Sequence, residues 1–189
     1  MRKLFLLLFA LPLNCFSQII LSSSTESDLV DKIKPPRELI DLILRNEPAD
    51  DVALLKECAA EEGSSVAEFF SVAAIQLNKD RQSDYFIRPA TQPYCFAFYG
   101  AHLFRYWFVA SERKDGKPHY RIVLKNGGDE VRVLRSVSRG HHDLELVGHN
   151  AVEEDTSTWH FDGKKYAIVG CVRRAIAPDK VQAVSDCRH

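Results

Sequence analysis

A change of hydrophobic period near Val72 constrains the fold of this chain more than any other feature. From there to Cys171, apolar residues recur at strand spacing, and short strand-like runs alternate with turn-forming residues. The sequence therefore predicts a β-rich region over residues 72–171. Its eight predicted strands are Val72–Leu77, Tyr85–Arg88, Leu103–Ser111, His119–Lys125, Val131–Arg135, Asp143–Val147, Ser157–Phe161 and Tyr166–Cys171.

Turn-forming residues separate several of these runs. Asp115-Gly116 and Asp162-Gly163 are favoured hairpin dipeptides, because the central residues of such turns need positive φ. Asn126-Gly127-Gly128 predicts a third turn. Short strands joined by tight turns favour an antiparallel sheet.

The region over residues 35–71 has a helical pattern instead. Pro35-Pro36 favours a helix start, and Asn46-Glu47-Pro48 favours its end. A second helix is predicted over Asp50–Glu62, and Ser65 with Glu68 predicts a capping box that opens a short turn. The inward-facing positions of the first helix are Leu39, Ile40, Ile43 and Leu44.

Together these patterns predict a single α+β domain over residues 35–189, with short N-terminal helices packed on a predominantly antiparallel sheet. Residues 18–34 are polar around Ser22 to Ser27, so we expect a flexible leader there. The tail over residues 172–189 is expected to be irregular or to form a short helix between Ala175 and Ser185.

The first 17 residues have the order of an export signal. Arg2 and Lys3 precede an uncharged apolar run from Leu4 to Leu13, which is too short to cross a bilayer core of about 30 Å as a helix. Small side chains follow, and we expect cleavage before Gln18. Lipidation of Cys15 is the alternative, but the residues before it lack the small side chains of such a site. The sequence therefore predicts a periplasmic or secreted protein with no transmembrane segment after cleavage.

Cleavage would leave 23 Lys and Arg against 26 Asp and Glu, a net charge of about −3. Clustered basic residues, which nucleic acids and anionic membranes require, are not apparent in the sequence. We therefore expect no nucleic-acid partner. If the protein has a partner, we expect another exported or envelope protein.

Four cysteines would remain in the exported chain. An even number favours two disulfides in an oxidising compartment, with three possible connectivities; one bridge and two buried thiols is the alternative. The cysteines form no C-x-x-C pair, so we expect neither a zinc site nor a redox motif. The disulfide candidates are Cys58, Cys95, Cys171 and Cys187.

The segment from Gln76 to Ile87 resembles the loop of FG-GAP-type repeats, D-x-N-x-D-G-x-x-D followed by a hydrophobic strand. In that family, alternate carboxylates and an amide hold a calcium ion. The pattern keeps Asn78, Asp80 and Asp84, but Gln76 replaces the first Asp and Arg81 replaces the Gly of the sharp turn. A carboxylate is lost and a positive charge is added, so we expect calcium binding to be lost.

Two further motifs extend this resemblance to small exported bacterial proteins with no assigned activity. The first is Arg139-Gly140-His141-His142-Asp143-Leu144, and the second runs from Trp159 through Phe161-Asp162-Gly163-Lys164-Lys165-Tyr166 towards Cys171. The resemblance covers about Leu39 to Cys171. It implies a shared fold and compartment, without an activity.

Histidines and acids provide the alternative of a small envelope hydrolase. His141, His142 and His149 are close in sequence, and His160 lies on a neighbouring predicted strand. However, His142 and His149 have opposite strand parity, and the chain contains no G-x-S-x-G nucleophile turn, P-loop or G-x-G-x-x-G motif. We therefore expect no metal or cofactor, and favour a non-catalytic protein over an enzyme.

Aromatic residues are dense between Tyr94 and Trp107. Phe96 and Phe98 have the same strand parity, so they would face the same side. Tyr99 and Trp107 have the opposite parity on their strands, so they would face the other side. If both faces are aromatic, one can form an exposed partner surface, for which Tyr99 and Trp107 are the candidates. The favoured hypothesis is a non-catalytic, exported protein-binding domain of the inhibitor, immunity or envelope-associated kind.

Overall fold

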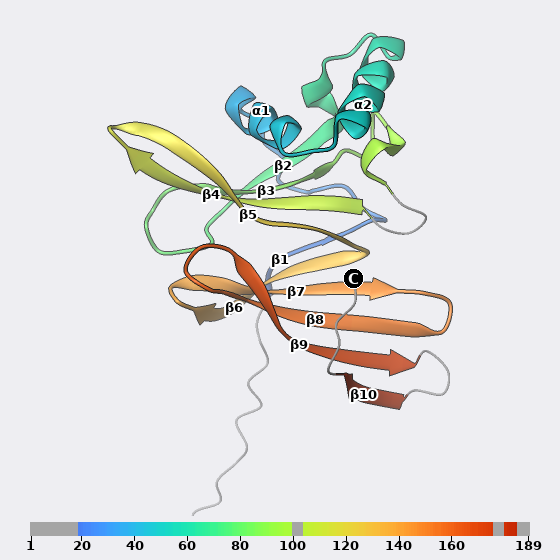
Figure 1. Ribbon diagram of the computed structural model, residues 1–189, viewed down its shortest axis with the longest axis vertical. Coiled ribbons are helices and arrows are strands. Elements are labelled where there is room, and N and C mark those ends of the chain that lie inside the picture. The colour runs from blue at the N-terminus through green and yellow to red at the C-terminus, as the bar shows by residue number, and fades with distance from the viewer. Residues whose placement is uncertain (1–18, 100–103, 176–179, 185–189) are drawn as a thin grey trace, which may run out of the picture.

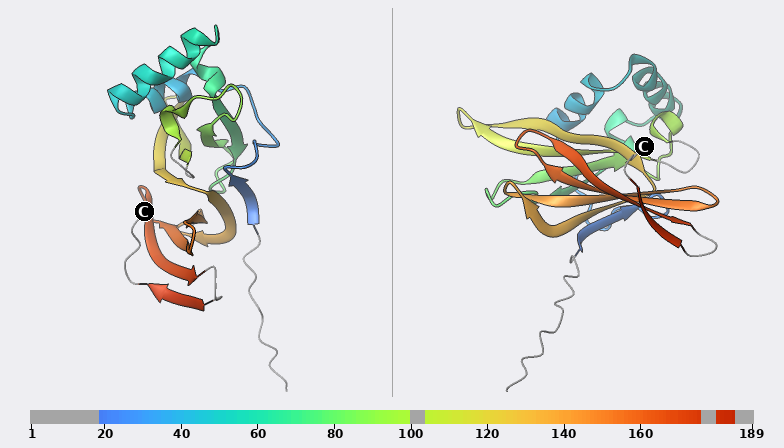
Figure 2. Two further views of the ribbon diagram at one scale, coloured as in Figure 1. Left: turned by 90° about the vertical axis from the view of Figure 1, so that its right-hand side faces the viewer. Right: turned by 60° about the horizontal axis from the view of Figure 1, so that its bottom comes forward.

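The computed structural model describes residues 19–99, 104–175 and 180–184 (Figure 1). Its described part combines two antiparallel β-sheets with two α-helices. One sheet has four strands and the other has six. Two views at right angles show the helices on one side of the smaller sheet and the larger sheet on its other side (Figures 1 and 2). The three layers are therefore helix, sheet and sheet.

The middle layer has the strand order β2-β3-β4-β5. Its strands are β2 (Phe70–Ile75), β3 (Asp84–Pro89), β4 (Phe104–Lys114) and β5 (Lys117–Gly128). We call it the covered sheet, because helices pack on its outer face.

The other sheet has the strand order β1-β6-β7-β8-β9-β10. Its strands are β1 (Ile19–Ser24), β6 (Glu130–Ser138), β7 (His141–His149), β8 (Glu153–Phe161), β9 (Tyr166–Ala175) and β10 (Lys180–Val184). We call it the open sheet, because Val169 and Val172 are exposed on β9.

The helical layer consists of α1 (Arg37–Arg45), α2 (Ala49–Glu61) and two 3-10 turns, η1 (Val66–Phe69) and η2 (Phe96–Phe98). A proline immediately precedes each α-helix, as proline tolerates the first helical turn. The predicted capping interaction is present, with the backbone N–H of Ser65 donating to Oε1 of Glu68 at 3.1 Å.

Alternation along the covered sheet divides its side chains between two cores. In β4, Tyr106 and Phe108 pack towards the open sheet, where they join residues such as Leu144. Trp107 and Val109 point the other way and pack beneath the helices. Both faces of β4 are therefore buried, which explains its nearly continuous apolar sequence.

All eight predicted strands are present, as β2 to β9, and seven are longer than predicted. The Asp115-Gly116 turn is confirmed, since both residues have positive φ, 52° and 76°. Gly163, with φ 105°, lies in the predicted turn between β8 and β9.

Four expectations about the boundaries are wrong. Residues 19–24 form β1, which pairs with β6, so the expected flexible leader is wrong for these residues. The expectation that helices form the N-terminal part is also wrong, because β1 precedes both helices. The serines there fit a strand because Ser23 is buried and its hydroxyl accepts a hydrogen bond from Arg88 at 3.1 Å. In the expected tail, β9 continues to Ala175 and β10 pairs with it instead of a helix forming.

The fourth correction concerns Asn126-Gly127-Gly128, which ends β5 and does not form a turn. A Cβ on Gly128 would lie 3.1 Å from the Tyr106 hydroxyl and 3.0 Å from the carbonyl oxygen of Val147. Glycine is therefore needed there for a close approach between the two sheets.

Candidate functional site

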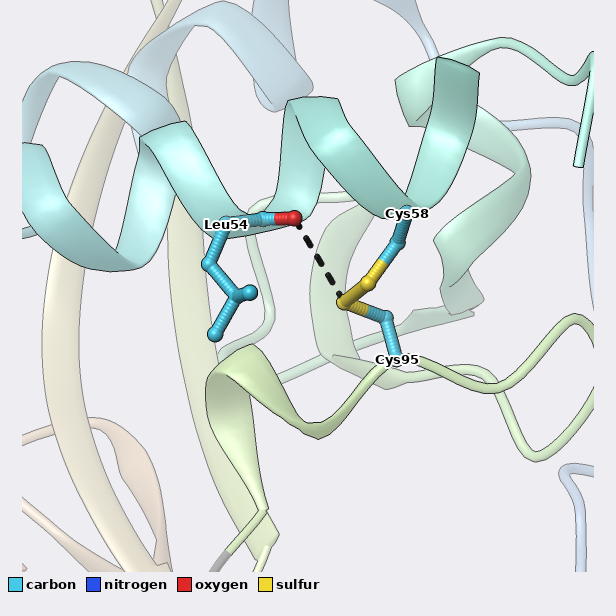
Figure 3. Close-up of a disulfide and its surroundings, with 3 residues drawn as sticks. All are labelled: Leu54, Cys58 and Cys95. Carbon is cyan, nitrogen blue, oxygen red and sulfur yellow. Dashed lines mark hydrogen bonds between the residues drawn. A yellow bond between two sulfur atoms is a disulfide. The ribbon is translucent and has the colours of Figure 1, made fainter. Parts of the chain in front are cut away.

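A disulfide between Cys58 on α2 and Cys95 joins the helical layer to the segment after β3 (Figure 3). Their Cα atoms lie 6.0 Å apart, and 37 positions separate them in sequence. The Cys95 Sγ lies 4.0 Å from the carbonyl oxygen of Leu54. Because a disulfide sulfur carries no proton, this is a packing contact. The bridge fixes one cysteine pair among the candidates.

Cys171 on β9 is disulfide-bonded as well. Cys187, the remaining candidate, lies outside the described residues, as do Cys15 and the predicted export signal. The Cys58–Cys95 bridge nevertheless fits an oxidising compartment, where disulfides form and persist.

Two aromatic residues flank the buried Cys95 and point to solvent. Tyr94 is 54% exposed and Phe96 is 59% exposed, whereas Cys95 and Phe98 are buried. The Tyr94 ring packs against Tyr99, with centroids 5.0 Å apart. The disulfide thus holds the backbone between two exposed rings, which we call the aromatic edge (Tyr94 and Phe96).

Tyr99, one of the two residues predicted for a partner surface, is partly buried behind this edge. Its hydroxyl donates to the carbonyl oxygen of Ala90 at 2.9 Å. Burial raises the pKa of the Tyr99 hydroxyl, although nearby Arg88 opposes the shift. Tyr99 therefore supports Tyr94 from behind and has little free surface of its own.

Trp107, the other residue predicted for a partner surface, is fully buried, so that assignment is wrong. Its indole Nε1 donates to Oε1 of Glu47 at 2.8 Å, and its ring packs edge-on against Phe98 and Phe70. The reason is the helical layer, which covers the face of β4 that the sequence pattern left open.

Glu47, between the two helices, anchors that layer on the covered sheet. Its side chain is fully buried and also pairs with Arg105 on β4 at 2.6 Å and with Lys125 on β5 at 3.1 Å. Arg105 contacts Asp51 on α2 as well, at 2.7 Å. The cations and the indole together compensate the buried carboxylate, which would otherwise be costly.

The exposed side of α2 beside the disulfide is acidic. Asp50, Glu57 and Glu61 are exposed and lie three or four residues from Leu54 or Cys58, the positions that face Cys95. Residues at this spacing are neighbours on a helix surface. The aromatic edge therefore has carboxylates at its border.

The loop that resembles a calcium site is stabilised by hydrogen bonds between its own side chains and backbone. The Asn78 Oδ1 accepts the N–H of Asp80, and the Asp80 Oδ1 accepts the N–H of Gln82, each at 2.8 Å. Arg81 has φ 66°, so it occupies the left-handed conformation that glycine adopts readily, at the position where the FG-GAP-type loop has glycine. Two of the three candidate ligands thus act as turn-stabilising acceptors.

Asp84, the third candidate ligand, is fully buried at the start of β3. Its two carboxylate oxygens accept the N–H groups of Leu77 and Ser111, both at 2.9 Å. Burial raises the pKa of Asp84, while these two hydrogen bonds lower it. Asp84 therefore ties β3 to its neighbouring segments.

The histidines have separate partners. His141 stacks on Phe161, with centroids 3.7 Å apart, and its Nε2 lies 3.3 Å from the Asn78 side-chain amide. The His142 carbonyl accepts a hydrogen bond from the Tyr166 hydroxyl at 2.7 Å. The contact with Asn78 joins the loop after β2 to the start of β7, and the other two contacts lie within the open sheet.

The other two histidines each lie beside a buried aspartate. His149 Nδ1 is 2.7 Å from Asp129, and His160 Nε2 is 3.8 Å from Asp143. Among the described residues, no group of three or more His, Cys, Asp or Glu side chains could hold a metal ion. The described structure thus does not bring the candidate histidines together.

Glu153, Glu154 and Asp155 belong to β8. Arg173 on β9 pairs with Asp155 at 2.7 Å and with Glu153 at 3.4 Å. Hydrogen bonding to Asp155 raises the pKa of Arg173. This group stabilises a strand pair.

Comparison with models of protein families, with curated proteins and with solved structures found no match to this chain. The FG-GAP-like resemblance therefore stays a prediction. Within the described residues, no helix is long and apolar enough to span a bilayer.

The sequence contained a further indication of the aromatic edge, which the argument from strand parity did not consider. Cys95 lies between Tyr94 and Phe96, so an inward-facing disulfide at that position sends its two neighbours outward. Glu47 gave no comparable signal, because it precedes a proline in what looked like a helix end.

Proposed function

We propose that this chain is an exported, non-catalytic binding domain that contacts another exported or envelope protein through the aromatic edge. One observation carries the proposal: Tyr94 and Phe96 are exposed on both sides of a disulfide-bonded cysteine. Exposed aromatic rings on a fixed backbone lose little entropy on binding and are common anchors at interfaces.

The chemistry around the edge favours a cationic partner segment. Aromatic faces attract Lys and Arg side chains, and the exposed carboxylates of α2 provide ion pairs nearby. The partner that fits best is therefore a segment in which basic residues alternate with apolar ones.

Export is the second part of the proposal. It is supported by the order of charged, apolar and small residues before Gln18, and by the disulfide between Cys58 and Cys95. Mass spectrometry of the protein from its native cells tests this part. A mature chain that begins at Gln18 with oxidised cysteines is expected, while an intact chain from the cell interior with free thiols would contradict it.

Fluorescence anisotropy with a short alternating lysine–leucine peptide tests the binding surface. We expect tighter binding than for the same peptide with glutamine in place of lysine. Replacing both rings, Y94A/F96A, should weaken binding by at least about tenfold, since one interface anchor contributes about 2 kcal/mol.

The matched control is I168A/V169A, which truncates two exposed apolar side chains on β9 of the open sheet. This variant should bind the lysine peptide as the unmodified protein does. An equal loss in both double variants, or equal affinity for both peptides, would count against the aromatic edge.

A further inference from the structure

A second surface feature, separate from the aromatic edge, is a polar cavity of about 340 Å³. It lies between the start of β3 and the β4–β5 hairpin. Its lining includes Arg81 from the loop before β3 and Arg113 from the hairpin. No carboxylate side chain lines it. The two charged side chains of its lining are therefore both positive.

Both guanidinium groups are available. Neither the Arg81 nor the Arg113 guanidinium group has a hydrogen-bond or ion-pair partner within the described part of the chain. Lys114 and Lys117 lie in the same hairpin, as do Asp115 and Glu112, which pairs with Arg121 at 3.4 Å, so cations outnumber carboxylates there by three to two over residues 112–117. A field of this sign raises the local concentration of anions.

The floor of the cavity is held in place by buried contacts. Asp84 accepts the Ser111 backbone N–H at 2.9 Å, and the Ser111 hydroxyl donates to the Ser83 carbonyl oxygen. The left-handed backbone of Arg81, at φ 66°, is fixed by the acceptor side chain of Asp80. The segments that carry the two arginines thus start from a fixed frame.

Two tyrosines supply an aromatic wall. Tyr85 and Tyr120 both line the cavity, and their rings meet edge to face with centroids 5.8 Å apart. Burial raises the pKa of Tyr85, so its hydroxyl stays protonated and can donate a hydrogen bond. Such a wall can pack against a sugar-like ring and bond its hydroxyl groups.

We propose that this cavity binds a small ring-bearing oxyanion, a phosphate or sulfate ester of sugar size. The planar guanidinium fork matches the oxygens of a tetrahedral anion, and two such groups reach one cavity here. The volume lies within the range of small-molecule sites, about 300–1,000 Å³. This ligand site is independent of the protein-binding surface, because no residue is shared.

Isothermal titration calorimetry on the mature protein tests the site. The probes are glucose 6-phosphate, glucose 6-sulfate, inorganic phosphate and glucose. Both esters should bind more tightly than inorganic phosphate, and glucose should not bind. Preference for one ester over the other identifies its source chemistry. Equal binding of an ester and inorganic phosphate, or no binding of either ester, would overturn the proposal.

The variant R81Q/R113Q should weaken binding of the ester by at least about tenfold, because one charge-assisted hydrogen bond contributes about 1.5 kcal/mol or more. The matched control is K114Q/K117Q, which removes the same charge from the hairpin outside the cavity lining. Its affinity should stay within about threefold. An equal loss in both variants would show a general field effect and overturn the site.

Discussion

The two sheets of this protein differ in how many of their faces are buried. The covered sheet lies between the helices and the open sheet, so neighbouring residues such as Trp107 and Phe108 are both fully buried. The open sheet buries one face, and on β9 it leaves Val169 and Val172 exposed. A strand's sequence reports how many of its faces are covered, but not what covers them.

The same difference explains where binding surface is available. Along β4, every ring from Phe104 to Phe108 is enclosed in one of the two cores. The aromatic edge lies outside the strands, where the disulfide at Cys95 leaves Tyr94 and Phe96 in solvent. The exposed aromatic side chains considered for binding therefore lie in the disulfide-linked segment between β3 and β4, and not on β4 itself.

The largest contrast is expected from side-chain truncation. W107A and F108A, on opposite faces of β4, should each lower the free energy of unfolding by about 3–5 kcal/mol, because each leaves a cavity in a core. V172A on β9 should cost no more than about 0.5 kcal/mol. Urea unfolding measures all three, and a small cost for W107A would break the comparison.

Removing the disulfide should have the next largest effect. C58S/C95S releases a loop of 37 residues between α2 and the aromatic edge. The unfolded chain gains entropy, so the free energy of unfolding should fall by about 3–4 kcal/mol. Thermal unfolding of the variant and of the unmodified protein, both without reductant, provides the check. A variant as stable as the oxidised protein would mean that the bridge does not brace this layer.

The buried carboxylate between the helices comes third. E47Q removes the carboxylate that pairs with both Arg105 and Lys125, and leaves Arg105 with Asp51 alone. It should lower the free energy of unfolding by about 2–3 kcal/mol, since both cations are about one-third exposed and partly screened. The comparison in the open sheet is E145Q, whose pair with Arg132 spans 3.6 Å, with an expected cost below about 1 kcal/mol. Equal losses in the free energy of unfolding for E47Q and E145Q would contradict this difference between the sheets.

The smallest effect concerns pH. Burial raises the pKa of Asp84 in the folded protein, so ionisation of Asp84 disfavours the folded state. The free energy of unfolding, relative to that of D84N, should therefore fall as the pH rises above about 3.9, the pKa of an unfolded aspartate. Urea unfolding from acid to neutral pH measures this difference. A relative rise in stability over that range would contradict the assigned direction.

Local patterns predicted the elements of this fold well. The strand alternation after Val72 located β2 to β9, and the Asp115-Gly116 pair located its hairpin. Both are properties of neighbouring residues, which a sequence displays directly. The serine-rich β1 was missed because its strand character comes from pairing with β6 and from the contact of Ser23 with Arg88.

Properties that depend on distant contacts could not be predicted. The sequence allowed three disulfide connectivities, and only the folded chain brings Cys58 next to Cys95. Trp107 looked available because nothing in β4 shows that Glu47 accepts its indole N–H from the helical layer. The cavity between Arg81 and Arg113 likewise depends on two segments that are far apart in the chain.

The covering of β4 by the helices is the claim on which the choice of binding surface depends. Acrylamide quenching of the fluorescence of W159F measures it most directly, because Trp107 is then the one tryptophan left in the chain. The account predicts blue-shifted emission that acrylamide barely quenches in the folded protein. Red-shifted emission, quenched as strongly as in the urea-unfolded chain, would show that this face of β4 is open and contradict the account.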